Sequence, residues 1–410
     1  MSCEIYDVAI AGGGPAGTSA AINLAQQGFR VLLAEQKSFP REKLCGEFIS
    51  PECIKHFERL GVANEITLAK GAELTETSFY ARNGNKVSVP SHWFGDDRAA
   101  IGLSRAEMDR ALLEGAKRIG VTVLEEAQVV DLIRDNQRVV GVLIRASEGV
   151  REYCAHLTID ATGRARTLAR KVDRERDSKG RARFVAFKAH LRNARVAPGV
   201  CEIYFYPGGY GGLNNIEGEL SNLCFIATAR DLRHSGSNPE QIIKSRVMRN
   251  TRAAFTLGEA NFVSSWLSVA LESFGRQELV PADGLLMSGD AAAFIDPFTG
   301  SGMLMALESG AVVADAIGEY RDYLVHESSF SQLANRYREQ YKSTFDSRLR
   351  VSGWLRRAAF VPRVAETAIS FFGLSDSLRR RVAQATRRPR NWKPHYGQPL
   401  TPSQDRPKPL

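Results

Sequence analysis

Three glycines and one acidic residue near the N-terminus have the types and spacing of a phosphate-binding turn. Gly12, Gly14 and Gly17 form the pattern G-x-G-x-x-G between an apolar segment, residues 5–11, and a helical pattern. Such glycines permit a tight strand-to-helix turn, close approach of a pyrophosphate, and close packing of helix against strand. Glu35 ends the next apolar segment, where its carboxylate can accept hydrogen bonds from a ribose and would repel a 2′-phosphate. The combination predicts a dinucleotide site that does not favour NADP.

A second set of residues, near position 290, distinguishes FAD from NAD. The apolar segment 285–290 ends at Asp290, and ligands of such sheets bind at the carboxyl ends of strands. The Asp290 carboxylate can accept a hydrogen bond from a ribityl hydroxyl of FAD. Gly300 and Gly302 then open a helix whose N–H groups can meet the flavin or its pyrophosphate. Two contacts so far apart in the chain suit the long FAD molecule, so we expect FAD as the cofactor.

Several motifs together resemble one flavoprotein superfamily. They are GGGPAG at 12–17, REKLCGE at 41–47, SRAEMD at 104–109, DATGRAR at 160–166 and GDAAAFIDPFTGSGM at 289–303. In this order they resemble the superfamily that holds the aromatic-ring hydroxylases, the geranylgeranyl reductases and the flavin halogenases. The geranylgeranyl reductase family is the most similar of the three. The resemblance implies an FAD-dependent oxidoreductase.

The resemblance also implies which residues contact FAD. It assigns the ADP half to Ala16 and Glu35, the ring or ribityl chain to Cys45 and Gly46, the pyrophosphate to Arg105 held by Asp109, the adenine to the Val129 backbone, the ribityl chain to Asp290, and the pyrimidine end to the N–H groups of Gly302 and Met303. From the residues alone, Cys45 could equally be a packed core thiol. Arg105 and Asp109, four residues apart, could equally be a surface ion pair.

The motifs leave three flavin chemistries open. Residues 296–300, DPFTG, resemble the reductases and halogenases more than the ring hydroxylases. Residues 46–51 have the G-E-x-x-x-P spacing of halogenases, but the W-x-W-x-I-P segment is missing and all four tryptophans are isolated. We therefore expect reduction of C=C bonds in an isoprenoid or a related lipophilic or polyketide substrate. A monooxygenase acting on an aromatic or polyketide substrate is the alternative, and a halogenase is a weaker one.

Aromatic residues of the middle segment indicate where a lipophilic substrate would bind. Residues 204–212, YFYPGGYGG, occupy the place of a Tyr/Phe-Pro-rich substrate segment in the reductases, although the tryptophan expected after it is replaced by Leu213-Asn214-Asn215. Aromatic side chains can stack on a flat or apolar substrate. Tyr206, Tyr210 and Pro297 are the candidate substrate contacts. Because no second G-x-G-x-x-G follows a strand, we expect NAD(P)H to bind only transiently, or electrons to come from a carrier.

Composition limits the remaining functions. The 410 residues are 43% hydrophobic with a net charge of +9, as in an ordinary globular enzyme. No C-x-x-C, H-x-H or H-E-x-x-H spacing occurs, so we expect no protein-bound metal and leave catalytic residues unassigned. The basic stretches lack nucleic-acid-binding signatures, so nucleic acid is not an expected partner. No apolar run approaches about 18 residues and no leader pattern opens the chain, which favours a cytoplasmic protein.

Periodicity predicts an α/β fold with a Rossmann-type nucleotide-binding domain, and the resemblance implies that this is an FAD-binding domain of the hydroxylase kind. We expect this domain to be discontinuous, with residues 1–175 and 275–330, and to hold an inserted antiparallel-sheet substrate domain at 176–274. Residues 331–392 read as helical and 393–410 as a disordered tail.

The C-terminal helical region is both basic and amphipathic. Apolar positions from Trp354 to Leu374 recur at helical spacing and are flanked by arginines. Basic amphipathic helices with aromatic anchors can lie in a membrane interface. The alternative is that these helices pack their apolar face on the substrate domain. Peripheral contact with the inner face of a membrane is therefore one of two hypotheses, and the oligomeric state stays open.

Overall fold

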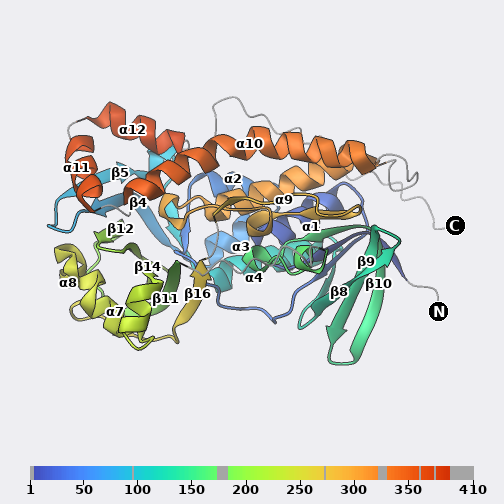
Figure 1. The fold of residues 1–410 in the computed structure, drawn as a ribbon, viewed down its shortest axis with the longest axis horizontal. Coiled ribbons are helices and arrows are strands. Elements are labelled where there is room, and N and C mark those ends of the chain that lie inside the picture. The colour runs from blue at the N-terminus through green and yellow to red at the C-terminus, as the bar shows by residue number, and fades with distance from the viewer. Residues whose placement is uncertain are drawn as a thin grey trace.

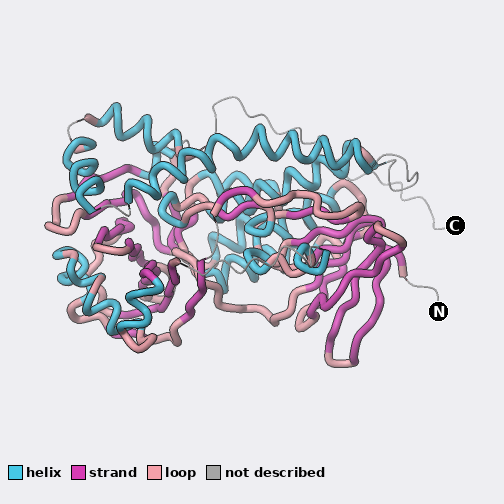
Figure 2. Tube along the Cα trace, in the orientation of Figure 1, coloured by secondary structure: helices cyan, strands magenta, loops and turns pink. Residues whose placement is uncertain are grey.

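The computed structural model describes residues 4–94, 97–172, 183–271, 274–321, 330–359, 362–373 and 375–387. Within them the chain forms two large sheets and one small strand pair, β17 (Gly275–Arg276) with β19 (Ala293–Phe294). The strands gather toward the two ends of the molecule, and helices lie between them and along one side (Figure 1, Figure 2). This is the mixed α/β architecture with a helical C-terminus that the sequence predicted.

The first sheet carries the glycine turn. Its order is β7-β2-β1-β10-β9-β8, with β18 paired to β10. The strands are β1 (Ile5–Ala11), β2 (Val31–Ala34), β7 (Thr122–Leu124), β8 (Gln128–Asp135), β9 (Arg138–Ala146), β10 (Gly149–Asp160) and β18 (Leu285–Met287). β1 lies parallel to β2 and to β10, which also pairs in parallel with β18. The carboxyl ends of these four strands therefore meet at one edge of the sheet.

Two helices from opposite ends of the domain pack closely beside this edge. α1 (Pro15–Gln26) follows the glycine turn, and α9 (Gly302–Glu319) follows the second predicted contact region. A Cβ on Gly310 of α9 would lie 2.5 Å from the carbonyl oxygen of Ala16, so only glycine fits there. Ser19 Oγ also donates to the carbonyl of Leu307 at 2.7 Å. α2 (Glu52–Arg59), α3 (Ala63–Leu68) and α4 (Arg105–Arg118) complete the helical layer.

The second sheet draws on more of the chain than the sequence predicted. Its order is β15-β11-β14-β13-β12-β4-β6-β3, with β16 paired to β11 and β5 to β4. The strands are β3 (Phe48–Ile49), β4 (Ala72–Tyr80), β5 (Lys86–Pro90), β6 (Ala100–Gly102), β11 (Phe184–Arg192), β12 (Gly199–Tyr206), β13 (Gly209–Asn215), β14 (Ser221–Thr228), β15 (Asn261–Phe262) and β16 (Leu267–Leu271).

Four strands of this sheet correct the predicted domain division. β3 to β6 fall inside residues 1–175, which the sequence assigned wholly to the FAD-binding domain. They join the sheet because β4 pairs in parallel with β12, a pairing between distant segments that local periodicity cannot show. The remaining neighbours along the sheet are antiparallel, as expected for residues 176–274. α6 (Ala229–His234), α7 (Pro239–Ser245) and α8 (Thr251–Leu257) belong to the same segment.

The C-terminal helices are α10 (Phe330–Ala359), α11 (Pro362–Phe372) and α12 (Asp376–Ala385). α10 runs along one side of the molecule and ends near α11 and α12 (Figure 1). α11 and α12 pack against β5, and Ile369 of α11 is buried in the core of the second sheet. The predicted tail, residues 393–410, lies outside the described residues. None of the described helices is both long enough and apolar enough to cross a bilayer.

A buried ion pair ties α10 to α9. Arg348 Nη1 lies 2.8 Å from Glu308 Oε2, and neither side chain is exposed to solvent. Taking two charges out of water is costly, so each is stable there only with the other in place.

We predict that Glu308→Gln destabilises the protein by roughly 3–5 kcal/mol, because it leaves the Arg348 guanidinium buried without a counter-charge. Urea unfolding of the FAD-free protein measures the change. The control is Glu319→Gln, which breaks the exposed Arg336–Glu319 pair and should cost less than about 1 kcal/mol. Equal, small effects of the two substitutions would contradict the prediction.

Candidate functional site

A cavity of about 1060 Å³ lies where the two sheets meet, with residues of both among its lining. One side is the glycine turn between β1 and α1. The opposite side comes from β11 to β14 of the second sheet, and segments 41–48 and 294–303 run along it. Segments that are far apart in the sequence therefore face one enclosed space.

Glycine occupies the three positions of the turn for different structural reasons. Gly12 has φ +106°, and a Cβ there would lie 2.4 Å from the carbonyl oxygen of Ala161. A Cβ on Gly17 would lie 1.9 Å from the carbonyl oxygen of Gly12, so helix and strand touch there. Gly14 has φ −78° and faces the cavity. Its Cβ would meet nothing closer than the guanidinium of Arg41, at 3.8 Å. The fold requires Gly12 and Gly17, whereas Gly14 leaves room for a ligand.

Glu35 stands at the end of β2, directly beside this turn. Its Oε2 accepts a hydrogen bond from the Gly13 N–H at 2.9 Å, and its Oε1 accepts one from the Lys37 N–H at 3.2 Å. The side chain is buried but borders the cavity. Arg41 Nη2 also donates to Oε2 at 3.3 Å. A carboxylate can accept about four hydrogen bonds, so capacity remains for about one more, such as a ribose hydroxyl.

Two arginines place positive charge next to Gly14. Arg105 forms a two-pronged ion pair with Asp109, at 2.8 and 2.7 Å, and Arg41 Nη1 lies 3.0 Å from the same carboxylate. Burial alone would lower the pKa of Arg105, but the Asp109 carboxylate outweighs it and raises that pKa. The pair is buried, which removes the alternative of a surface ion pair. Arg41 Nε is buried with no hydrogen-bond partner, which suits an arriving phosphate oxygen.

The structure brings most of the predicted contact residues to the cavity. Those that line it, besides Gly12, Gly14, Glu35 and Arg105, are Ala16, Cys45, Gly46, Val129, Asp290, Gly302, Met303, Tyr210 and Pro297. Burial raises the pKa of the Asp290 carboxyl, which would favour a hydrogen-bonding partner such as a hydroxyl. Their individual cofactor and substrate contacts remain predictions.

Two predicted residues do not reach the cavity. Gly17 packs helix against strand, as its motif position requires. Tyr206 is a correction, because it ends β12 inside the sheet core rather than facing a substrate. Its hydroxyl donates to the carbonyl oxygens of Tyr210 and Ile226, both at 2.9 Å. An aromatic side chain at a hairpin can satisfy its hydroxyl on the backbone, which the sequence pattern does not reveal.

One end of the cavity is aromatic. Phe298 packs with Phe79, Phe205 and Tyr210 at ring-centroid distances of 5.5–5.7 Å. Phe79, Phe298 and Tyr210 border the cavity itself. The Tyr210 hydroxyl donates to Asp296 Oδ1, which ties β13 to the segment before α9. This end suits a flat or apolar ligand.

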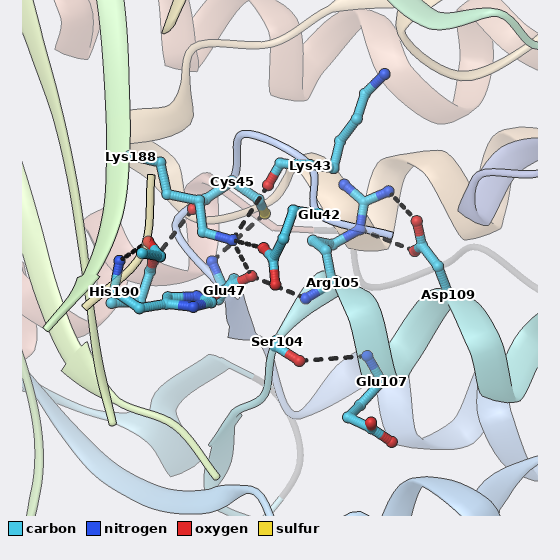
Figure 3. Close-up of polar contacts among 12 residues, drawn as sticks. Glu42, Lys43, Cys45, Glu47, Ser104, Arg105, Glu107, Asp109, Lys188 and His190 are labelled. Atoms are coloured by element: carbon cyan, nitrogen blue, oxygen red, sulfur yellow. Dashed lines mark hydrogen bonds and ion pairs between the residues drawn. The ribbon is translucent and has the colours of Figure 1, made fainter. Parts of the chain in front are cut away.

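A cluster of charged side chains joins segment 42–47 to β11, and it was not predicted from the sequence (Figure 3). Lys188 Nζ lies 2.5 Å from Glu42 Oε2 and 2.5 Å from Glu47 Oε1, and His190 Nε2 lies 2.7 Å from Glu47 Oε2. Ligand atoms of Glu42, Glu47 and His190 lie within 4.8 Å of one another, but the Lys188 ammonium already sits on both carboxylates. Lys188 and His190 stand two apart on the apolar strand β11, and that alternation is the signal that could have found them.

The fold and the cavity define a dinucleotide-binding flavoprotein. A glycine turn opens onto a space flanked by the Glu35 carboxylate and two arginines, and a second strand end lies across it. Residues 5–320 match the protein family described as "FAD binding domain". The chain belongs to that FAD binding domain family, which confirms the expected cofactor, FAD, and the expected class of FAD-dependent oxidoreductase.

Relatives of known name share about a quarter of their residues with this chain. The digeranylgeranylglycerophospholipid reductase of Methanosarcina acetivorans is 26% identical over 354 residues, 83% of this chain and 81% of the relative. The menaquinone reductase of Mycolicibacterium smegmatis is 27% identical over 339 residues, 77% of this chain and 78% of the relative.

Solved structures share the fold. A flavin-dependent brominase is similar with a TM-score of 0.76 and 21% identity, covering 93% of this chain and 94% of the other. A geranylgeranyl bacteriochlorophyll reductase-like protein of Thermoplasma acidophilum has a TM-score of 0.75 and 20% identity, covering 91% and 93%. At these identities the similarity establishes the architecture, and the reaction has to be argued from the site.

We predict that Gly14→Val lowers the affinity for FAD at least about 100-fold, or roughly 2.7 kcal/mol, because a branched side chain occupies the space of the pyrophosphate. The FAD content after gel filtration and the quenching of flavin fluorescence on binding measure it. The variant should still fold, since its Cβ has room. Gly353→Val, at another glycine with open space, is the control and should keep FAD. Stoichiometric FAD in the Gly14 variant would refute the assignment of the turn.

Proposed function

We propose that the protein reduces C=C bonds of an isoprenoid or a related lipophilic or polyketide substrate. Electrons would come from transiently bound NAD(P)H or from a carrier. The observation that carries the proposal is the aromatic end of the cavity, which is continuous with the FAD-binding turn. Support comes from the reductases among the relatives, which are named for a digeranylgeranyl lipid and for menaquinone.

The residues of the cavity divide the work of such a reaction. When bound, FAD supplies the hydride. Arg41, Arg105 and Glu35 would hold its diphosphate and ribose, and the rings of Phe79 and Phe298 would exclude water from an apolar substrate. Burial, followed by the Asp296 charge, raises the pKa of Tyr210 well above its ordinary value, so its hydroxyl keeps its proton at the cavity wall.

Oxygen chemistry is the alternative proposal. A flavin-dependent monooxygenase would use the same cofactor site and aromatic end, and a halogenase is less well supported. Glu47, the acid of the G-E-x-x-x-P spacing, is occupied by Lys188 and His190 instead of pointing freely toward a substrate. Reduction of a C=C bond and oxygen chemistry differ in what reoxidises the reduced cofactor.

We predict that, without oxygen, the FAD-loaded protein reduced by NADPH, NADH or dithionite is reoxidised by a lipophilic alkene. Geranylgeraniol is a suitable probe, because it has no quinone ring that the reduced flavin could reduce instead of a C=C bond. Flavin absorbance follows the reaction, and mass spectrometry should find a product heavier by two hydrogens for each reoxidised FAD. A product that instead gains oxygen, formed only with oxygen present, would replace the reductase proposal with the monooxygenase.

We further propose that the C-terminal helices dock the protein on an anionic membrane surface. Trp354 of α10 and Phe371 of α11 are 73% and 58% exposed, although α10 packs on α9 and α11 packs on the second sheet. Arg350 and Arg357 are exposed one turn before and after Trp354, on the same face of α10. Residues 350–387 hold eight arginines and only two acidic residues. Exposed aromatic anchors among arginines are typical of interfacial binding, and a lipophilic substrate would be met there.

We predict that the protein floats with vesicles containing phosphatidylserine at low salt and less so at high salt or with neutral vesicles. Arg350→Gln with Arg357→Gln should lower the partition coefficient roughly 30-fold, at about 1 kcal/mol for each charge. Trp354→Ala should also lower it, whereas Leu68→Ala, at an exposed apolar residue elsewhere, should not. Recovery in the soluble fraction with every vesicle would reject the membrane proposal and leave only the packing role of these helices.

A further inference from the structure

The cavity segment 42–47 is fastened to the second sheet rather than to the sheet that carries the glycine turn. Asn222 Nδ2 donates to the Cys45 carbonyl at 3.1 Å, and Asn214 Nδ2 donates to the Glu47 carbonyl at 3.3 Å. Lys188 and His190 of β11 bind the Glu47 side chain (Figure 3). The second sheet therefore holds segment 42–47, which borders the cavity.

Within this attachment, Glu47 is unusually constrained. Its side chain is fully buried and its backbone has φ +52°, in the left-handed region that favours glycine. Its Oε1 accepts from Lys188 Nζ and from the Arg105 N–H at 2.8 Å, and its Oε2 contacts His190. The carboxylate thus touches β11 and the start of α4 at the same time.

The charges of the cluster are maintained despite burial. Burial alone would raise the pKa of Glu47, but the hydrogen bond from His190 and the charge of Lys188 outweigh it and hold that pKa below its usual range. Burial alone would likewise lower the pKa of Lys188, but the charge of Glu47 and the hydrogen bonds to both carboxylates raise it. At neutral pH Glu47 and Lys188 therefore carry full, opposite charges with little solvent to screen them.

Stability gives no sufficient reason for such an arrangement. Replacing a buried ion pair by packed apolar residues is often neutral or stabilising. The cluster lies beside Cys45 and Gly46, which border the cavity and are predicted to lie beside the flavin ring or its ribityl chain. Two-electron reduction, with protons taken from the solvent, makes the ring system richer in electrons, so nearby fixed charges change the energy of reduction.

We propose that Glu47 and Lys188, with Glu42 and His190, set the reduction potential of the bound FAD from the substrate-side sheet. Lys188 favours the reduced cofactor and the two glutamates oppose it, so the balance of the cluster fixes the potential. In this role Lys188 and His190 are positioning residues, because they act on the cavity through the Glu47 carboxylate, whereas Glu42 and Glu47 border the cavity themselves.

The proposal predicts shifts of opposite sign from the two partners of one ion pair. Glu47→Gln removes a negative charge and should raise the potential, whereas Lys188→Met removes a positive charge and should lower it. We expect each to change the equilibrium constant for reduction about tenfold, which is about 30 mV for a two-electron couple. The double variant should lie near the wild type. A purely structural role would shift both single variants in the same direction, by loosening the same segment.

The experiment is an anaerobic redox titration of the full FAD-loaded chain against a reference dye, with flavin absorbance as the readout. Glu202→Gln is the matched control, since Glu202 is a buried, ion-paired glutamate of the same sheet outside the cavity lining, and its potential should not move. If Glu47→Gln or Lys188→Met fails to retain FAD, Glu42→Gln decides, because the Glu42 side chain is 44% exposed and its loss need not disturb folding.

Glu42→Gln should raise the potential, and the FAD content of the purified variant checks that the cofactor is retained. Shifts of the same sign in the Glu47 and Lys188 variants, or an unchanged potential in Glu42→Gln, would overturn the proposal. An equal shift in Glu202→Gln would also overturn it, because the effect would then not belong to the cluster.

Discussion

The contact between α1 and α9 determines where everything else in the cofactor site can lie. The backbones approach until only glycine fits at position 310, and Ser19 binds the facing carbonyl of Leu307. α1 begins at the glycine turn and α9 begins beyond Asp290, so their contact brings these two segments together. β1 and β18 already end at one edge of the sheet, because both pair in parallel with β10.

Charge is distributed unevenly over the cavity. Arg41 and Arg105 place positive charge near Gly14, where we expect the diphosphate, and Glu35 places a carboxylate beside the turn, where we expect the ribose hydroxyls. The opposite end is lined by aromatic rings, which give it low polarity. Between them lies segment 42–47, whose buried charges come from the other sheet. The two sheets thus border one cavity from different sides, and Glu47 connects β11 of the second sheet with the start of α4.

The C-terminal helices serve the fold before they serve any partner. Ile369 is buried against the second sheet and Arg348 pairs with Glu308 in the core, so α10 and α11 are structural parts of the enzyme. The packing alternative drawn from the sequence is therefore realised for their apolar faces. It does not account for Trp354 and Phe371, which stay exposed among arginines. One amphipathic region can pack inward along one face and still present another to a charged surface.

The sequence alone was sufficient wherever the chemistry depends on neighbours along the chain. Gly12, Gly14, Gly17 and Glu35 belong to one strand-helix-strand unit, whose geometry follows from local backbone sterics. The Arg105–Asp109 pair could be predicted because residues four apart lie on the same face of a helix. Asp290 and Gly302 followed from the end of an apolar segment and the start of a helix, whereas Cys45 and Val129 were added only because of the resemblance.

The tertiary structure decided everything that depends on pairing between distant segments. The parallel pairing of β4 with β12 placed strands β3 to β6 in the second sheet, and the hairpin at Tyr206 turned its hydroxyl onto the backbone. The Glu47–Lys188 contact joins residues 141 positions apart. A lysine in an apolar strand reads as an isolated anomaly, because the carboxylate that makes its burial stable is brought to it only by folding.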